Sequence, residues 1–311
     1  MLGALGLLAV GAVVLYVGAE AAVRGAATLA RAPGIRPFVL GALLFGIDLE
    51  SLGTAVAASA RGETALAAGE IVGTVLFLFG AAFGAALLVA RGPIPSPGPV
   101  LVLTPALHLV AGAFALTDRY VTRLEGAFLV AMYAAYVGLL VRGGRLPRGT
   151  TEIERDTDRA GWRGGTPAKA ALTVGGLALV AAGATVLVAG ATRFTAASGL
   201  AAGFVGAAIL GVLVSLDELV LEVLPVRRGQ AELATGNLFG TLPAMAAGVM
   251  GLAALVHPLD VDSAGAAGYL AMAFLYAVVA TVFLARGRAG RWLGAFVLVS
   301  YAAWLVVSST L

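Results

Sequence analysis

Residues 61–74 read RGETALAAGEIVGT, and residues 228–241 read RGQAELATGNLFGT. A shift of 167 residues superposes the two stretches and aligns an Arg-Gly pair, a Leu-Ala pair and a Gly-x-x-x-Gly-Thr segment. The same shift places Leu49 on Leu216. In a chain rich in alanine and glycine, matches between these residues are common by chance. The evidence for a repeat is therefore the Arg-Gly pair and the glycine spacing. We infer an internal repeat.

The composition places this repeat in a membrane. Of 311 residues, 60% are hydrophobic and only 12% are charged, and the mean hydropathy is +0.98. Soluble globular domains are far more polar. Cysteine is absent, which excludes disulfides, thiolate metal sites and thiol nucleophiles. The 20 basic residues are spread through short loops and form no single patch, so we expect no nucleic acid partner.

Ten apolar runs are long enough to cross a hydrocarbon core of about 30 Å as helices. The first has no basic flank ahead of it and no clear cleavage site, so we expect a retained span. We therefore expect an all-α polytopic membrane protein in the lipid bilayer. The runs fall near residues 3–23, 37–59, 65–90, 98–116, 124–141, 169–191, 198–224, 231–256, 265–285 and 291–309.

A polar stretch separates five spans from five. Residues 142–169 hold seven basic and four acidic residues. We expect a first five-helix repeat at residues 1–141, a polar linker at 142–168 and a second five-helix repeat at 169–311. Because each half has an odd number of spans, the second half enters the membrane with inverted topology. Inverted repeats are typical of secondary transporters, whose site lies where the repeats meet.

The placement of basic residues predicts the orientation. Lys and Arg are retained on the cytoplasmic side during insertion. With both termini outside, 16 of the 20 basic residues fall on the inner side. We therefore expect a plasma (inner) membrane protein with both termini outside and the linker, 142–168, in the cytoplasm. The sequence leaves the oligomeric state open, a homo-oligomer included.

Eight of the 17 acidic residues lie within or at the edge of apolar runs, and the basic residues do not accompany them. A charge at the bilayer centre costs roughly 2.5–3.5 kcal/mol, so such acids indicate a bound cation, a proton or a water-filled cavity. Two clusters occupy matching places of the repeat, GIDLES at 46–51 and SLDE at 215–218. Calcium takes about six to eight oxygen ligands, and broken transporter helices supply carbonyls. The pattern favours a calcium site.

The remaining membrane acids have more than one interpretation. Glu20 is expected to snorkel near a helix end, and Glu232 to interact with the positive end of a helix dipole. Glu70 matches Asn237 in the repeat, which favours a pore-lining role for both. Glu222 follows Glu218 by one turn and either shares its cavity or faces water on the inner side.

These motifs resemble those of the calcium/cation antiporter superfamily, the group of sodium/calcium and proton/calcium exchangers. Family repeats carry a G-T-S-L-P-E type segment, then R-G, then G-N-x-x-G-S-N. Here LVSLDE at 213–218 precedes Arg-Gly at 228–229, Gly-Asn at 236–237 and Gly-Thr at 240–241. In the first repeat, GIDLES at 46–51 precedes Arg-Gly at 61–62, Gly-Glu at 69–70 and Gly-Thr at 73–74. The resemblance implies cation exchange by two inverted five-helix repeats.

The two repeats differ in how well they match the calcium-binding glutamate of the family. Glu218 falls directly on the family's calcium-binding glutamate. In the first repeat Ser51 stands at that position, with Glu50 beside it. Either Glu50 takes over the role, or the alignment shifts by one residue.

The hydroxyl and amide positions of the family are also changed. Ser215 keeps one family hydroxyl, and Thr74 and Thr241 stand in for the serines of the G-S-N segments. Leu78 and Met245 replace the asparagine or aspartate ligands that follow. The resemblance therefore implies a site with fewer sodium ligands than the family pattern.

We expect a secondary active transporter, not an enzyme, that exchanges a divalent cation, calcium first, for protons or sodium by alternating access. Glu50 and Glu218 are the expected principal ligands. Neighbouring carboxylates in an apolar site cannot all ionise comfortably, which makes exchange for protons chemically accessible. No resident cofactor is expected. The expected supporting ligands or proton carriers are Asp48, Asp217, Ser215, Thr74, Thr241, Glu70, Asn237 and Ser51.

Two other functions stay open from the sequence. One is a degenerate relative that binds or senses cations without transporting them. The other is a membrane-embedded enzyme with paired carboxylates. Against the enzyme, the sequence has no nucleophile with an adjacent base and no H-E-x-x-H motif.

Overall fold

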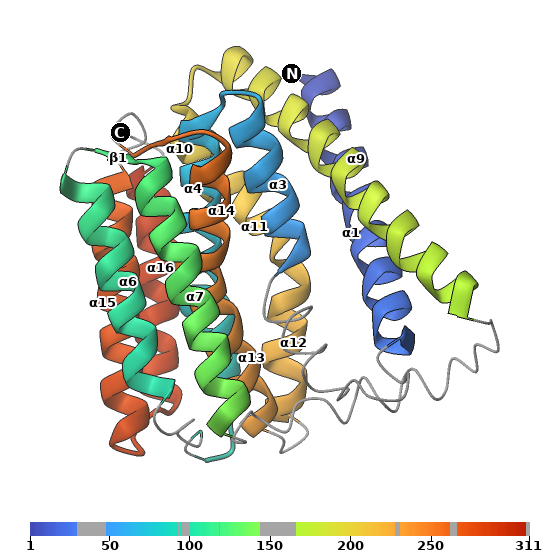
Figure 1. Ribbon diagram of the computed structural model, residues 1–311. Coiled ribbons are helices and arrows are strands. Elements are labelled where there is room, and N and C mark those ends of the chain that lie inside the picture. The colour runs from blue at the N-terminus through green and yellow to red at the C-terminus, as the bar shows by residue number, and fades with distance from the viewer. Residues whose placement is uncertain are drawn as a thin grey trace.

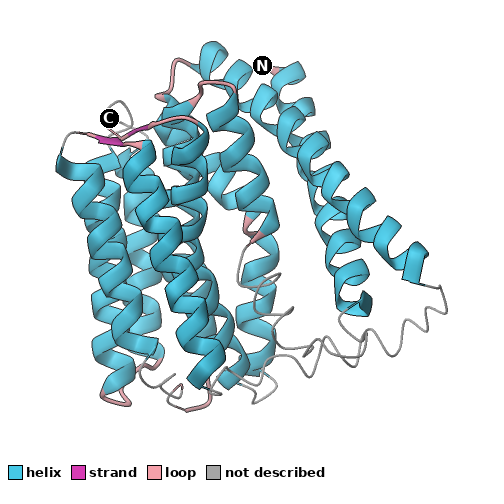
Figure 2. Cartoon of the chain, viewed as in Figure 1, coloured by secondary structure: helices cyan, strands magenta, loops and turns pink. Residues whose placement is uncertain are grey.

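The computed structural model describes residues 1–29, 48–92, 94, 100–117, 119–143, 166–227, 231–261 and 266–308. Within these ranges the chain is helical except for loops and two strands of two residues each (Figure 2). The predicted all-α class is confirmed. Predicted span two, at 37–59, is described only from residue 48.

Helices of the first half correspond to predicted spans one to five. Span three is continuous but contains a π-helical turn, η1, between two α-helical segments. The elements are α1 (Leu2–Leu29), α3 (Leu49–Ala60), α4 (Thr64–Phe77), η1 (Leu78–Phe83), α5 (Gly84–Val89), α6 (Val100–Thr117), β1 (Tyr120–Val121) and α7 (Arg123–Gly143).

Helices of the second half correspond to spans six to ten. Spans seven and eight also contain π-helical turns, η2 and η3. The elements are α9 (Thr166–Ser198), α10 (Ala202–Val205), η2 (Gly206–Leu210), α11 (Gly211–Val214), α12 (Leu216–Arg227), α13 (Ala231–Pro243), η3 (Ala244–Val249), α14 (Met250–Val256), β2 (Leu259–Asp260), α15 (Ala266–Ala285) and α16 (Arg291–Ser308).

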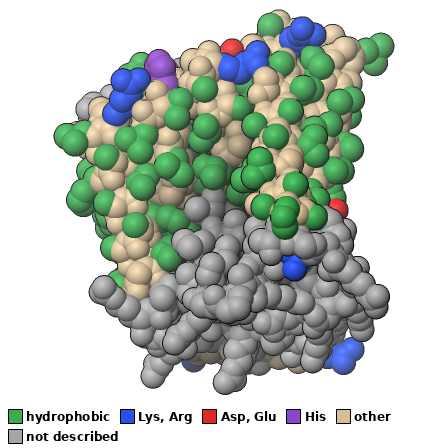
Figure 3. All heavy atoms as spheres, turned by 45° about the vertical axis from the view of Figure 1, so that its right-hand side comes forward, with side chains coloured by type: hydrophobic (Ala, Val, Ile, Leu, Met, Phe, Trp, Pro, Cys, Tyr) green, Lys and Arg blue, Asp and Glu red, His purple; other side chains and the backbone are tan. Residues whose placement is uncertain are grey.

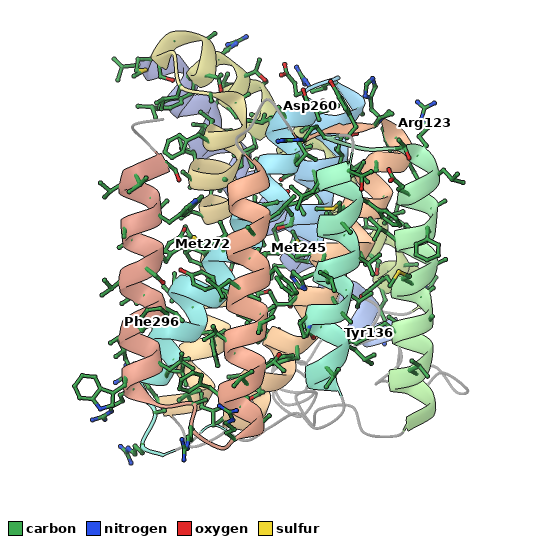
Figure 4. The ribbon with its side chains drawn as sticks, turned by 90° about the vertical axis from the view of Figure 1, so that its left-hand side faces the viewer. Arg123, Tyr136, Met245, Asp260, Met272 and Phe296 are labelled. Atoms are coloured by element: carbon green, nitrogen blue, oxygen red, sulfur yellow. The ribbon has the colours of Figure 1, made fainter. Side chains whose placement is uncertain are left out.

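By length and composition, five of the described helices can cross a membrane unaided. Three shorter apolar helices accompany them. On the face shown in Figure 3, apolar side chains are spread over the described surface below the Lys and Arg side chains at its upper edge. Phe296 on α16 points outward and is 60% exposed (Figure 4). A surface of this kind suits lipid. The five helices are Leu2–Ala22, Thr64–Val89, Pro167–Ser198, Asn237–Val256 and Arg291–Ser308.

The two halves run in opposite directions. In Figure 1 α1 descends from the face that carries both termini, whereas α9 rises toward that face. Helix α7 ends, and α9 begins, at the opposite face. Strands β1 and β2 pair antiparallel at the terminal face, with Tyr120 opposite Asp260, and thereby join the two halves. The inverted relation inferred from the odd number of spans is confirmed.

Glycines bring the helices at the centre into backbone contact. Helix α4 is buried from Leu66 to Phe77. A Cβ added at Gly206 would lie 2.8 Å from the backbone nitrogen of Glu70, and one added at Gly211 would lie 2.8 Å from that of Thr74. Side chains at these glycines would therefore push η2 and α11 away from α4. Close approach of this kind is what small residues allow in membrane helices.

Candidate functional site

Two helices begin at matching places inside the bundle. Helix α3 begins at Leu49 with Asp48 as its N-cap, and α12 begins at Leu216, directly after Ser215. Ser215 ends α11 with φ −114° and ψ 13°, which breaks span seven into two segments. Asp48 and Ser215 are equivalent under the 167-residue shift. Each half thus directs one helix N-terminus into the interior, and at Ser215 the second half has the kind of helix break found at transporter sites.

Asp48 caps α3 and holds Ser51. The backbone N–H of Ser51 donates to Asp48 Oδ1 at 3.0 Å, and the Ser51 hydroxyl donates to Oδ2 at 2.6 Å. Asp48 is only 8% exposed, and Ser51 is fully buried. A carboxylate that accepts the first N–H groups of a helix stabilises that helix start. Asp48 therefore positions the polar end of α3.

Thr74 connects the two halves. Its hydroxyl donates to Glu70 Oε1 at 3.3 Å, accepts from the Ser215 hydroxyl at 3.2 Å and lies 3.4 Å from Ser51 Oγ. Ser51, Thr74, Glu70 and Ser215 are each fully buried. One polar cluster therefore joins α3 and α4 of the first half to the break before α12 in the second. We call Asp48, Ser51, Glu70, Thr74 and Ser215 the threonine cluster.

A second cluster lies on α12 and α13. The side-chain amide of Asn237 donates to Glu218 Oε2 and, at 3.3 Å, to Glu222 Oε1. Glu218 is 5% exposed and Glu222 is fully buried. We call Glu218, Glu222 and Asn237 the asparagine cluster. Because Ser215 lies three residues before Glu218, the two clusters adjoin on one turn of chain.

The carboxylates of both clusters are buried. Every arginine whose side chain the structure describes is exposed. Glu70 and Glu222 each keep one oxygen, Oε2, without a hydrogen-bond partner among the described residues. Buried carboxylates are costly unless a cation or a proton accompanies them. The arrangement suits a cation that reaches the centre from outside the protein.

The structure gives fewer details for the other residues expected from the sequence. Glu50 lies in the first turn of α3 and is half-buried. Thr241 is fully buried, and its hydroxyl has no partner among the described residues. The side chain of Asp217 lies outside the described part. Within that part, no three His, Asp or Glu side chains are arranged to hold a metal ion. A cation here would therefore need hydroxyl, amide or carbonyl oxygens as well.

Two fully buried polar residues were not among the ligands expected from the sequence. Glu222 shares Asn237 with Glu218, and its spacing of four residues from Glu218 was the only signal. Thr54 on α3 is fully buried, and its hydroxyl has no partner among the described residues. Its position on α3 beside Ser51 gave no signal in the sequence. The apolar residues four positions after Thr74 and Thr241, Leu78 and Met245, are both fully buried.

Comparison with known proteins places this chain among transporters. A family profile described as sodium/calcium exchanger protein matches residues 3–142 and 169–310. A protein of Alkalimonas amylolytica named as an antiporter, CaxA, is 28% identical, and the match covers 87% of this chain and 86% of CaxA. The inner membrane protein YrbG of Escherichia coli (strain K12) is 26% identical, with 99% and 97% covered.

Two further matches agree with this family. The sodium/calcium exchanger MaX1 of Methanosarcina acetivorans is 24% identical, with 97% of each chain covered. A solved structure of the sodium-calcium exchanger NCX_Mj soaked with Na⁺ and Sr²⁺ superposes with a TM-score of 0.65 at 19% identity, over 97% of each chain. At this identity the structural likeness concerns the fold.

Proposed function

The chain belongs to the sodium/calcium exchanger family, a family of membrane transporters and not of enzymes, and on that premise we propose that it exchanges calcium for protons or sodium. The cation would bind where the two halves meet, between Glu50 and Glu218. The observation that carries this proposal is the hydrogen-bonded junction of the halves, in which Ser215 donates to Thr74 at 3.2 Å. Hard divalent cations prefer such oxygen-rich sites.

The proposed ligands come from both halves of the chain. Glu50, Ser51 and Thr74 would contribute oxygens from the first half, and Ser215 and Glu218 from the second. Asp48 would hold the start of α3 in place through its two hydrogen bonds to Ser51. The remaining proposed ligands or proton carriers of the site are Asp217, Thr241, Glu70 and Asn237.

Alternating access follows from the symmetry of the halves. Two inverted repeats can exchange conformations, which opens the shared site first to one membrane face and then to the other. A carboxylate of the site would release the calcium to one face and accept the counter-ion there. The protein then returns with the counter-ion bound, so the two fluxes are coupled.

We also propose the membrane placement and the division of the chain. The profile matches at 3–142 and 169–310 support repeats at 1–141 and 169–311 with a linker at 142–168. The excess of basic residues on the linker side supports a cytoplasmic linker and outside termini. The name of the relative YrbG supports an inner membrane location.

Neutral variants of the two principal carboxylates test this function. Glu50→Gln and Glu218→Gln, purified and reconstituted in proteoliposomes, should lose calcium uptake. Glu125→Gln is the matched control, because Glu125 lies at the start of α7 and accepts from Thr122 at 2.8 Å, away from both clusters. Full uptake by both site variants would overturn the proposal. A calcium-induced thermal shift without uptake in the unmodified protein would indicate binding only.

A further inference from the structure

Four exposed arginines lie where α5 and α15 end and α16 begins. Arg91 comes two residues after the end of α5, Arg286 and Arg288 lie between α15 and α16, and Arg291 is the first residue of α16. Helix α15 ends and α16 begins at the face opposite the termini (Figure 1). The parts of the sequence that carry these arginines, residues 71–117 and 263–311, contain no acidic residue. The arginines therefore have no carboxylate partner within their own segments.

Close packing holds the end of α5 beside the start of α16. A Cβ added at Gly294 on α16 would lie 3.1 Å from the backbone nitrogen of Leu88 on α5. Beyond the two helices, the Ile94 N–H donates to the Ala289 carbonyl oxygen at 3.3 Å, and both of these residues are buried. Arg91, three residues before Ile94, is thereby held near the connection that carries the other arginines.

An exposed apolar stripe continues from the arginines along α16. Trp292 is 91% exposed, Phe296 is 60% exposed and Val299 is 67% exposed. Their spacing of four and three residues places them on one side of the helix, and Figure 4 shows Phe296 pointing outward. Tryptophan is enriched at the boundary between lipid headgroups and acyl chains. We therefore place Trp292 at that boundary, which puts the neighbouring arginines at the level of the headgroups.

We propose that this surface binds an anionic phospholipid of the leaflet opposite the termini. The arginines would bind the phosphate, because guanidinium groups pair with phosphate oxygens through charge-assisted hydrogen bonds. An acyl chain would lie along Phe296 and Val299. This lipid patch is exposed, whereas the threonine and asparagine clusters are buried, so the inference does not depend on the exchanged cation. The patch consists of Arg91, Arg286, Arg288, Arg291 and Trp292.

The combination of charge and apolar surface favours an anionic phospholipid over other ligands. A soluble phosphate would use the arginines but not the apolar stripe. A zwitterionic phospholipid would use the stripe, but the arginines would repel its ammonium group. Basic residues next to a membrane helix attract anionic headgroups, and exposed apolar side chains suit acyl chains. An anionic phospholipid uses both parts of the surface at once.

Lipid binding to the purified protein in detergent tests the proposal. The protein is titrated with phosphatidylglycerol or with phosphatidylcholine of the same acyl chains, and native mass spectrometry measures the bound lipid. Phosphatidylglycerol should bind the unmodified protein about tenfold more tightly than phosphatidylcholine. The double variant Arg288→Gln/Arg291→Gln should raise the half-saturating phosphatidylglycerol concentration about thirtyfold. That factor corresponds to about 2 kcal/mol, at about 1 kcal/mol for each arginine near an anionic surface.

Two control proteins separate lipid binding from general effects of the substitutions. Arg193→Gln is the matched control, because Arg193 is also exposed but lies near the end of α9, at the face of the termini (Figure 1). It should change the affinity for phosphatidylglycerol less than about twofold. The double variant Arg288→Lys/Arg291→Lys keeps both charges. It should still prefer phosphatidylglycerol to phosphatidylcholine, so it tests the patch even if the glutamine variant fails to fold.

Glycerol 3-phosphate distinguishes a lipid from a free phosphate, because it offers the charged group without acyl chains. At the same concentration it should not displace phosphatidylglycerol. Its displacement of the lipid would overturn the lipid site in favour of a soluble anion. Equal binding of the two lipids, or unchanged affinity in the glutamine variant, would also overturn the proposal. None of these results bears on calcium exchange, which uptake assays measure separately.

Discussion

Thr74 joins the two halves by hydrogen bonds. The variant Thr74→Val measures what these bonds contribute to calcium binding. Valine has nearly the same shape, so the packing of buried α4 is retained while the hydroxyl is lost. The change removes the bonds to Glu70 at 3.3 Å and from Ser215 at 3.2 Å, and the 3.4 Å contact with Ser51. These distances lie at the long end of the hydrogen-bond range. Two such bonds contribute about 1.4 kcal/mol together, which corresponds to about tenfold in affinity.

Calorimetry in detergent measures calcium binding to the purified Thr74→Val protein. The expected dissociation constant is about tenfold higher than that of the unmodified protein. Thr185→Val is the control, because the exposed Thr185 hydroxyl donates only to the Ala181 carbonyl, at 2.8 Å. Unchanged affinity in Thr74→Val would refute the reasoning that the threonine cluster joins the halves at the ion site.

Variants at three further positions test the scaffold around the site. Asp48→Ala should lower the free energy of unfolding by about 1 kcal/mol, because α3 loses its cap, and thermal denaturation in detergent measures the loss; Asp48→Asn should retain most of the stability. Gly211→Leu should abolish uptake, because its side chain would meet the backbone of Thr74, and wild-type uptake would contradict that packing. Gly175→Ala should leave uptake and folding unchanged, since an added Cβ there meets nothing within 4 Å; lost expression would show that α9 packs differently.

The fold was predictable because membrane insertion imposes simple constraints. Three features are sufficient to predict ten helices in two inverted halves. They are the length of the apolar runs, the odd number of spans in each half, and the repeat at residues 61–74 and 228–241. The break of span seven at Ser215 and the π-helical turns were not predicted. A helix break or a π-helical turn changes the backbone hydrogen bonds of a few residues but not their hydropathy. The hydropathy pattern of the sequence therefore gives no signal for either.

The sequence predicted the residues of the candidate site better than it predicted the contacts between them. The repeat indicated Ser215, Thr74 and Glu218, and the structure brings the first two within 3.2 Å. Thr54 and Glu222 were not among the expected ligands, because their burial inside the bundle depends on how the helices pack. The pairing of Ser51 with Thr74 sets which faces of α3 and α4 meet, and that pairing is a property of packing. Asp48, expected as a ligand or proton carrier, is bonded to Ser51 at the start of α3.

Calcium exchange across the membrane is the central claim, and one measurement tests it most directly. Labelled calcium uptake is followed in proteoliposomes under an imposed proton gradient, under an imposed sodium gradient, and without either gradient, with Glu218→Gln in parallel. The account predicts uptake that at least one gradient accelerates and that Glu218→Gln abolishes. Uptake that neither gradient changes, or full gradient-driven uptake by Glu218→Gln, would contradict it.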